Sequence, residues 1–91
     1  MAVYLVTYDL KAPGRNYQPV YDYLKQFTYC KGLESVWLIQ TSYSALTILD
    51  NLKRLIDAND VTFVVQITAS ADWASYRYSC GNWLNQPSRS F

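Results

Sequence analysis

The chain has 91 residues, of which 51% are hydrophobic and 16% are charged, and its eight Lys and Arg against seven Asp and Glu give a formal net charge of +1. This composition predicts one small domain and excludes a disordered main body. The charge lacks the clear basic excess that is typical of nucleic-acid-binding proteins. The sequence contains no histidine, which excludes histidine general bases, Ser-His-Asp triads and the usual zinc sites.

The cellular compartment is predicted from apolar runs and cysteines. No apolar run reaches membrane-spanning length, and the first residues lack the basic region of a secretory signal. We therefore expect a cytoplasmic protein without membrane contact. Cys30 and Cys80 have no close metal-ligand spacing. In that compartment we expect reduced thiols, and the sequence leaves a disulfide between them open.

The first predicted strand, residues 3–10, is the segment around which the rest of the chain is organised. It is rich in β-branched and aromatic residues and is followed by Lys11-Ala12-Pro13-Gly14, which is typical of a turn. Large apolar side chains fall on both of its faces, as expected for a central strand. The exception is Asp9, near its carboxyl end. This carboxylate either caps the following turn or binds a metal ion, and the sequence leaves both interpretations open.

Three further strands and two amphipathic helices are predicted. The strands are short runs of apolar and β-branched residues, at positions 28–31, 35–41 and 61–68. The helices have apolar residues at helical spacing, over positions 17–27 and 45–57. This order predicts an α+β fold, a ferredoxin-like βαββαβ sandwich with two helices on one face of an antiparallel sheet. Within it, we expect the first and third strands to run parallel and the fourth to lie antiparallel beside the first.

A domain boundary is predicted near residue 72. Residues 1–72 form the ferredoxin-like domain, and residues 73–91 form a C-terminal arm that is either an interface or partly disordered. The sheet face without helices would leave a large apolar surface exposed, so we expect a homodimer. Because tyrosine and tryptophan concentrate in protein contacts, the arm is expected to contribute aromatic residues to the dimer interface, namely Trp73, Tyr76, Tyr78 and Trp83.

Polar residues are predicted to gather at one edge of the sheet. Asp9 and Asp60 are expected there together with both helix amino termini, which favour anions through their free N–H groups. Lys11 and Arg15 lie in the adjoining loop and are candidates for nucleic-acid binding through phosphate contacts. Asp60 is expected to cap the turn before the last strand.

The strand ending in Tyr8-Asp9, the loop with Arg15, the amphipathic helix and the strand Ser35-Val36-Trp37-Leu38 together resemble the CRISPR-associated spacer-acquisition nuclease family. The similarity spans residues 2–69. It is closer to stand-alone SinR-like relatives than to the VapD toxin ribonucleases. The resemblance implies the same fold, a homodimer formed through the sheet, and a catalytic Asp9 that binds Mg²⁺ or Mn²⁺ between two protomers.

Two functions of different classes follow from these observations. The first is a metal-dependent endonuclease or endoribonuclease that cleaves phosphodiesters of RNA or DNA as a homodimer. The second is a non-catalytic dimeric module of the same fold that binds a nucleic-acid or protein partner. The position of Asp9 and the resemblance favour the nuclease. The balanced charge favours the binding module, so the sequence leaves enzymatic activity open.

Overall fold

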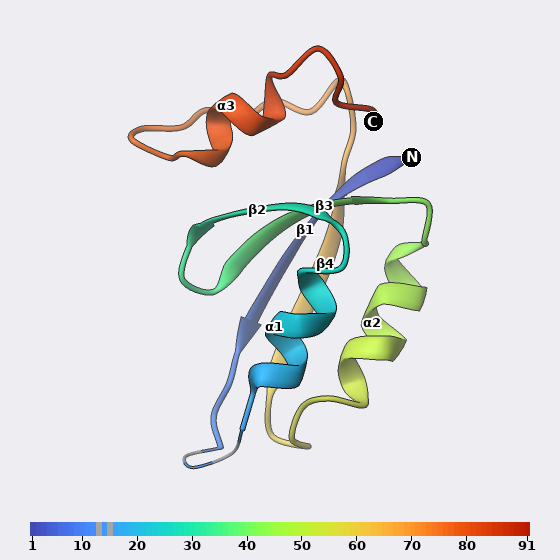
Figure 1. Ribbon diagram of the computed structural model, residues 1–91, viewed down its shortest axis with the longest axis vertical. Coiled ribbons are helices and arrows are strands. Elements are labelled where there is room, and N and C mark those ends of the chain that lie inside the picture. The colour runs from blue at the N-terminus through green and yellow to red at the C-terminus, as the bar shows by residue number, and fades with distance from the viewer. Residues whose placement is uncertain (13, 15) are drawn as a thin grey trace.

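The computed structural model describes residues 1–12, 14 and 16–91, which form one sheet with helices on both sides (Figure 1). The strands are β1 (Ala2–Asp9), β2 (Thr28–Leu33), β3 (Val36–Thr41) and β4 (Val61–Ile67). The helices are α1 (Gln18–Leu24), α2 (Ala45–Lys53) and α3 (Cys80–Leu84). The strand order is β2-β3-β1-β4. No helix in the described part of the chain is long and apolar enough to cross a membrane.

The predicted fold class is wrong. A third helix, α3, follows β4 and lies on the opposite side of the sheet from α1 and α2 (Figure 1). The sheet is antiparallel throughout, so β1 and β3 are not parallel; Ala2 faces Thr41 and Thr7 faces Val36. A layout with only two helices, and with helices on one face only, therefore does not describe this chain. Helical periodicity missed α3 because it has only five residues, one of them glycine, and is held by contacts with the sheet rather than by its own propensity.

The larger hydrophobic cluster lies between the sheet and the first two helices. Its buried side chains come from alternate positions of β1 and β3 and from one face each of α1 and α2: Tyr4, Val6, Trp37, Ile39, Val20, Leu24, Ile48 and Leu52. Helix α2 begins after Ser44, whose Oγ accepts a hydrogen bond from the N–H of Thr47 at 3.1 Å. This is the cap that satisfies a free N–H in the first turn.

A smaller cluster covers part of the other sheet face and includes a disulfide. Its buried members are Val3, Leu38, Cys80 and Leu84. The Cys30–Cys80 bond, with Sγ atoms 2.08 Å apart, joins β2 to α3, so the expected reduced thiols are wrong. The sequence alone could not pair these cysteines because the fold brings together residues that are 50 positions apart.

The C-terminal segment is also held by polar contacts. The guanidinium of Arg89 lies 3.7 Å from the ring centroid of Trp83 and donates a hydrogen bond to Oε1 of Gln40 at 2.8 Å. At the end of the chain, the hydroxyl of Ser90 donates to the backbone carbonyl of Met1 at 3.1 Å. Residues 83–90 are therefore tied to the sheet through β3 and the chain start.

Two glycines allow the segment before and within α3 to approach its neighbours closely. A Cβ added to Gly32 in β2 would overlap the ring of Tyr78. A Cβ on Gly81 would lie 2.8 Å from the hydroxyl of Ser75. A larger residue at Gly32 would force Tyr78 away from the sheet, whereas one at Gly81 would displace Ser75 within the arm.

Removing the disulfide should lower the free energy of unfolding. A cross-link between residues 50 positions apart restricts the unfolded chain, which in the chain-entropy model stabilises the fold by about 4 kcal/mol. We expect the double variant Cys30→Ser, Cys80→Ser to unfold at a lower urea concentration, with a free energy of unfolding that is lower by up to that amount.

The matched control for this comparison is the wild-type protein with its disulfide reduced. It should unfold at the same urea concentration as the double variant. Equal stability of the oxidised protein and the variant would contradict the assigned role of the bond.

Candidate functional site

Asp9 and Lys11, two of the predicted site residues, lie where β1 ends. The Asp9 side chain is 68% exposed, and its Oδ2 lies 3.6 Å from Nζ of Lys11. An ion pair at this exposure adds little stability because water screens it. Arg15 lies outside the described residues. The structure thus brings Asp9 and Lys11 together at the surface.

Asp60, rather than Asp9, is the carboxylate that organises this edge. Its Oδ1 accepts the backbone N–H of Lys11 at 2.6 Å. Its Oδ2 accepts the hydroxyl of Tyr17 and the backbone N–H of Asp57, both at 2.7 Å. The expected capping role of Asp60 is confirmed, and the same side chain also joins the loop after β1 to the turn before β4.

The described residues of one copy of the chain do not form a metal centre. Within residues 1–12, 14 and 16–91, no three or more Asp, Glu, Cys or His residues are grouped so that they could hold a metal ion. The exposed carboxylate of Asp9 faces an ammonium group instead of a second acid. A divalent ion prefers several oxygen ligands, so the residues of one protomer do not fit Mg²⁺ or Mn²⁺.

A hollow of about 510 Å³ adjoins Asp9, and we call it the tyrosine hollow. It is lined by Tyr8, Asp9, Leu10, Tyr17, Tyr21, Lys31, Glu34 and Ser35. A second hollow of about 350 Å³ shares Tyr21 and Lys31 with it and adds Gln18, Lys25, Tyr29 and Trp37. The two hollows are therefore neighbours, and residues of α1 and of the β2–β3 hairpin line both.

The aromatic walls of the tyrosine hollow are fixed by hydrogen bonds. The Tyr8 hydroxyl accepts from Nε1 of Trp37 at 3.0 Å and donates to the backbone carbonyl of Glu34 at 3.4 Å. Burial raises the pKa of Tyr8, although the Trp37 hydrogen bond opposes this, so the phenol stays neutral at physiological pH. Nζ of Lys31 lies 5.6 Å from the ring centroid of Tyr21 and 5.4 Å from that of Trp37. These are cation–π distances.

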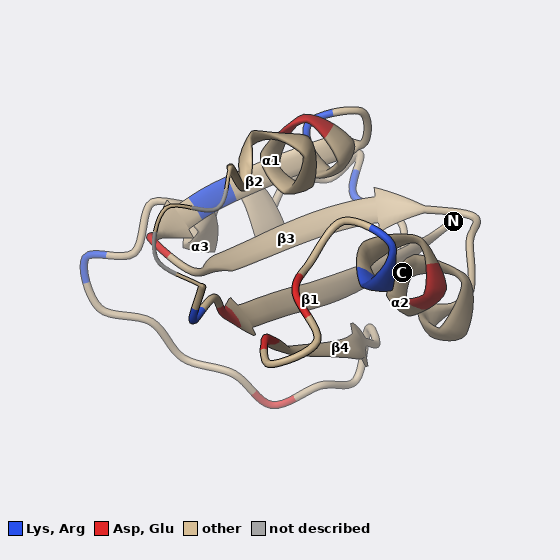
Figure 2. Cartoon of the chain, turned by 90° about the horizontal axis from the view of Figure 1, so that it is seen from below, with Lys and Arg blue, Asp and Glu red and all other residues tan. Residues whose placement is uncertain are grey.

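Charge elsewhere is interspersed, with basic and acidic positions spread over the fold rather than gathered by sign (Figure 2). Sequence reasoning missed the tyrosine hollow because its lining comes from separate segments. Its tyrosines come from β1 and from α1 with the residue before it, and Lys31, Glu34 and Ser35 come from the hairpin. Nine tyrosines in 91 residues were the available signal, but composition does not show which tyrosines share a wall.

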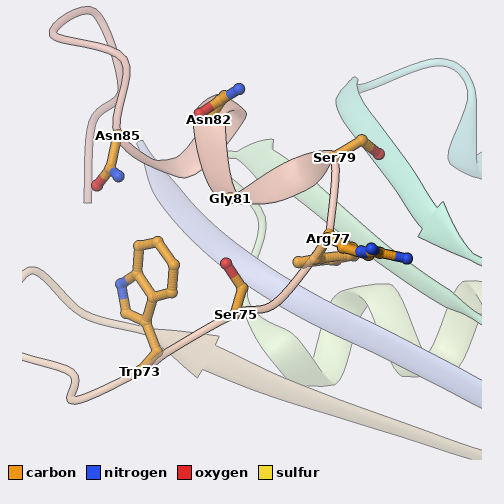
Figure 3. Close-up of a pocket in the computed structure, with 8 residues that line it drawn as sticks. Trp73, Ser75, Arg77, Ser79, Gly81, Asn82 and Asn85 are labelled. Atoms are coloured by element: carbon orange, nitrogen blue, oxygen red, sulfur yellow. The ribbon is translucent and has the colours of Figure 1, made fainter.

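A pocket of about 390 Å³ lies within the C-terminal arm, whose residues alone line it (Figure 3). Trp73, Ser75, Gly81 and Asn85 lie around it, while the guanidinium of Arg77 points away. Because the guanidinium points away, the pocket walls present mainly uncharged polar groups. The backbone of Arg77 has a φ of 55°, a left-handed conformation that is uncommon for a residue other than glycine.

The predicted interface aromatics fall into two pairs. Tyr78 and Trp83 pack against the smaller cluster of their own sheet. Trp73 and Tyr76 are exposed, Tyr76 at 82% of its surface. Trp73 and Tyr76 are therefore the members of this set that remain available to another molecule.

The uncovered part of the second sheet face carries apolar side chains from β4. Val61, Phe63 and Val65 are 53%, 58% and 39% exposed. In the register with β1, they lie opposite Asp9, Thr7 and Leu5, respectively. We call Val61, Phe63 and Val65 the open stripe. Asp9 is thus next to an apolar surface on the same face.

No protein-family model matches the sequence, and no solved structure matches it significantly. The predicted resemblance to the CRISPR-associated nuclease family therefore stays a prediction.

Removing the Asp60 carboxylate should destabilise the protein, whereas removing the Asp9 carboxylate should not. Asp60→Ala leaves the N–H groups of Lys11 and Asp57 without their acceptor, which should lower the free energy of unfolding by about 2–3 kcal/mol. Asp9→Ala is the matched control and should change it by less than about 0.5 kcal/mol. Urea unfolding of both variants measures the difference, and equal effects would contradict the assignment.

Proposed function

We propose that the protein is a homodimeric, non-catalytic binding module that holds a nucleic-acid strand in the tyrosine hollow of each protomer. The observation that carries the proposal is the hollow itself, in which Tyr8, Tyr17 and Tyr21 line the walls beside Lys31. Its volume of about 510 Å³ lies in the range of small-molecule sites. One nucleotide therefore fits the available space.

The chemistry of the lining suits both parts of a nucleotide. Every base has a π-face that stacks on tyrosine, at about 1–3 kcal/mol per base, without requiring a particular sequence. Lys31, and Lys25 in the adjoining hollow, supply cations for phosphate. The carboxylates of Asp9 and Glu34 are acceptors for the exocyclic amino groups of bases.

Dimerisation compensates for the low net charge. One protomer carries a net charge of only +1, so phosphate attraction per chain is small. Two copies place two hollows on one particle, and a strand that reaches both gains from their effective concentration. The open stripe supports dimer formation because its apolar side chains face water in the single protomer.

Mutation of the hollow should weaken strand binding. We expect fluorescein-labelled single-stranded RNA and DNA to bind the wild-type protein at low salt. Tyr21→Ala should raise the dissociation constant about 5- to 150-fold, the range expected for losing one stacked base. Fluorescence anisotropy across a salt series measures this.

Tyr76→Ala is the matched control because Tyr76, 82% exposed in the arm, lies outside the hollow. It should bind as the wild type does, and Lys31→Ala should make the salt dependence shallower by about one ion. Absence of binding to both oligonucleotides at low salt, or an unaffected Tyr21→Ala, would rule out the hollow as the strand site.

The second candidate is the metal-dependent endonuclease, which one observation favours. Asp9 is exposed and lies opposite Val61, at the end of the open stripe. Because one protomer does not supply a metal site, this function requires a dimer whose two-fold axis brings two Asp9 carboxylates together. Mg²⁺ or Mn²⁺ is the ion class that such a pair of carboxylates suits.

The binding-module proposal expects no cleavage of RNA or DNA by the purified protein with Mg²⁺ or Mn²⁺ between neutral and alkaline pH. Gel analysis of labelled oligonucleotides tests this. Cleavage that disappears in Asp9→Asn, with the variant still folded and dimeric, would establish the nuclease instead. Cleavage that survives Asp9→Asn would indicate a contaminating enzyme or another site.

A cytoplasmic location stays a prediction, and the disulfide bears on it. Reducing thiols in the cytosol usually keep cysteines unpaired. The Cys30–Cys80 bond therefore weighs against that location.

A further inference from the structure

We propose that β4 pairs antiparallel with β4 of a second copy, so that two sheets of four strands join into one continuous sheet. The inference rests on the proposed homodimer and specifies its interface. It follows from a difference between the two edge strands of the sheet. One of them is protected against pairing with another chain, and the other is not.

Strand β4 is an unprotected edge. It is the last strand in the order β2-β3-β1-β4, and its sequence, VTFVVQI, contains no charged residue and no proline. Exposed edges of natural sheets usually carry lysine, proline or a bulge that prevents pairing with another chain. The apolar side chains of the open stripe alternate along this edge. Such a strand is suited to pairing.

Strand β2, the other edge, has the protection that β4 lacks. It contains Lys31 and Gly32, and its register with β3 shifts between Cys30 and Leu33. It is also cross-linked to α3 through Cys30. The two edges therefore differ within one sheet, and the difference selects β4 as the contact.

The partner is a second copy because β4 is complementary to itself. With a two-fold axis at Val64, Phe63 of one copy faces Val65 of the other, and Val61 faces Ile67. Thr62 then faces Gln66. Apolar residues meet apolar residues and polar residues meet polar ones along all seven positions. An axis at Phe63 would instead oppose Thr62 with Val64 and leave Ile67 without a partner in the strand.

This arrangement places the two Asp9 residues far apart. Asp9 lies opposite Val61, three positions from the proposed axis. With strands about 4.8 Å apart and a rise of about 3.4 Å per residue, two Asp9 Cα atoms would be about 25 Å apart. One metal ion cannot bridge that distance, so edge pairing is consistent with a binding module and not with a shared metal site.

Cysteine cross-linking tests the register. Phe63→Cys and Val65→Cys variants are mixed, oxidised with copper phenanthroline and run on non-reducing gels, and the linked peptides are identified by mass spectrometry. Both positions are exposed in the protomer, so the variants should fold. We expect the mixture to form a cross-linked heterodimer, whereas Phe63→Cys alone should stay largely unlinked.

Sedimentation of the same protein measures dimerisation separately. Val65→Lys places two ammonium groups in the paired edge, so it should raise the dimer dissociation constant about tenfold or more. Leu33→Lys is the matched control: Leu33 is 56% exposed at the end of β2, which is the opposite edge of the sheet. It should dimerise as the wild type does.

The outcomes separate this inference from the proposed function. Efficient self-linking of Phe63→Cys would overturn the register centred on Val64. A wild-type dimer that neither links nor responds to Val65→Lys would overturn edge pairing and leave the homodimer standing on another surface. A protein that stays monomeric at high micromolar concentration would overturn both, while oligonucleotide binding would still test the tyrosine hollow independently.

Discussion

The two apolar faces of β1 constrain the whole fold. Val3 and Val6 are completely buried, and they point to opposite sides of the sheet. The strand is also paired on both edges, with β3 and β4, so it lies inside the sheet with buried valines on both faces. Cover is therefore required on both sides. Two helices supply it on one side, and the short C-terminal arm supplies it on only part of the other.

The incomplete cover explains why the exposed features cluster where they do. The smaller cluster covers the sheet near Val3 and Leu38, at the end away from Asp9. On the β4 side, toward Asp9, the same face is open, and β4 exposes its apolar side chains there. The disulfide fixes the boundary because it holds α3 against β2. The Cys30–Cys80 bond holds the arm over one part of this face. The rest of the face is open because the arm does not extend over it.

Local pattern predicted the strands and the first two helices because each is determined by its own residues. Alternation and β-branched content located β1, β3 and β4, and apolar residues at helical spacing located α1 and α2. The third helix and the disulfide escaped prediction because both depend on tertiary contact. The predicted fold class was wrong for the same reason. The local sequence of residues 73–91 does not indicate which surface the arm covers.

The candidate site also combines features that the local sequence predicts with features that depend on tertiary contacts. The sequence singled out Asp9 from its position at the end of a strand, but it could not show which carboxylate receives the hydrogen bonds. The donors to Asp60 come from residues 49 and 43 positions away, so no spacing rule identifies them. The tyrosine hollow is likewise assembled from distant segments. Chemistry that arises from contacts between such segments becomes visible only in the fold.

The disulfide also determines how the chain responds to mechanical force. Residues 30–80 form a closed ring, and only the segments outside it can be drawn out by pulling on the two termini. At about 3.6 Å per residue, the intact chain would extend to about 150 Å, and the reduced chain to about 330 Å. The ring contains β3, α2 and β4. An unfolding motor pulls a protein through its pore from one end. At Cys30 or Cys80 such a pore would therefore have to admit two cross-linked segments of the chain side by side.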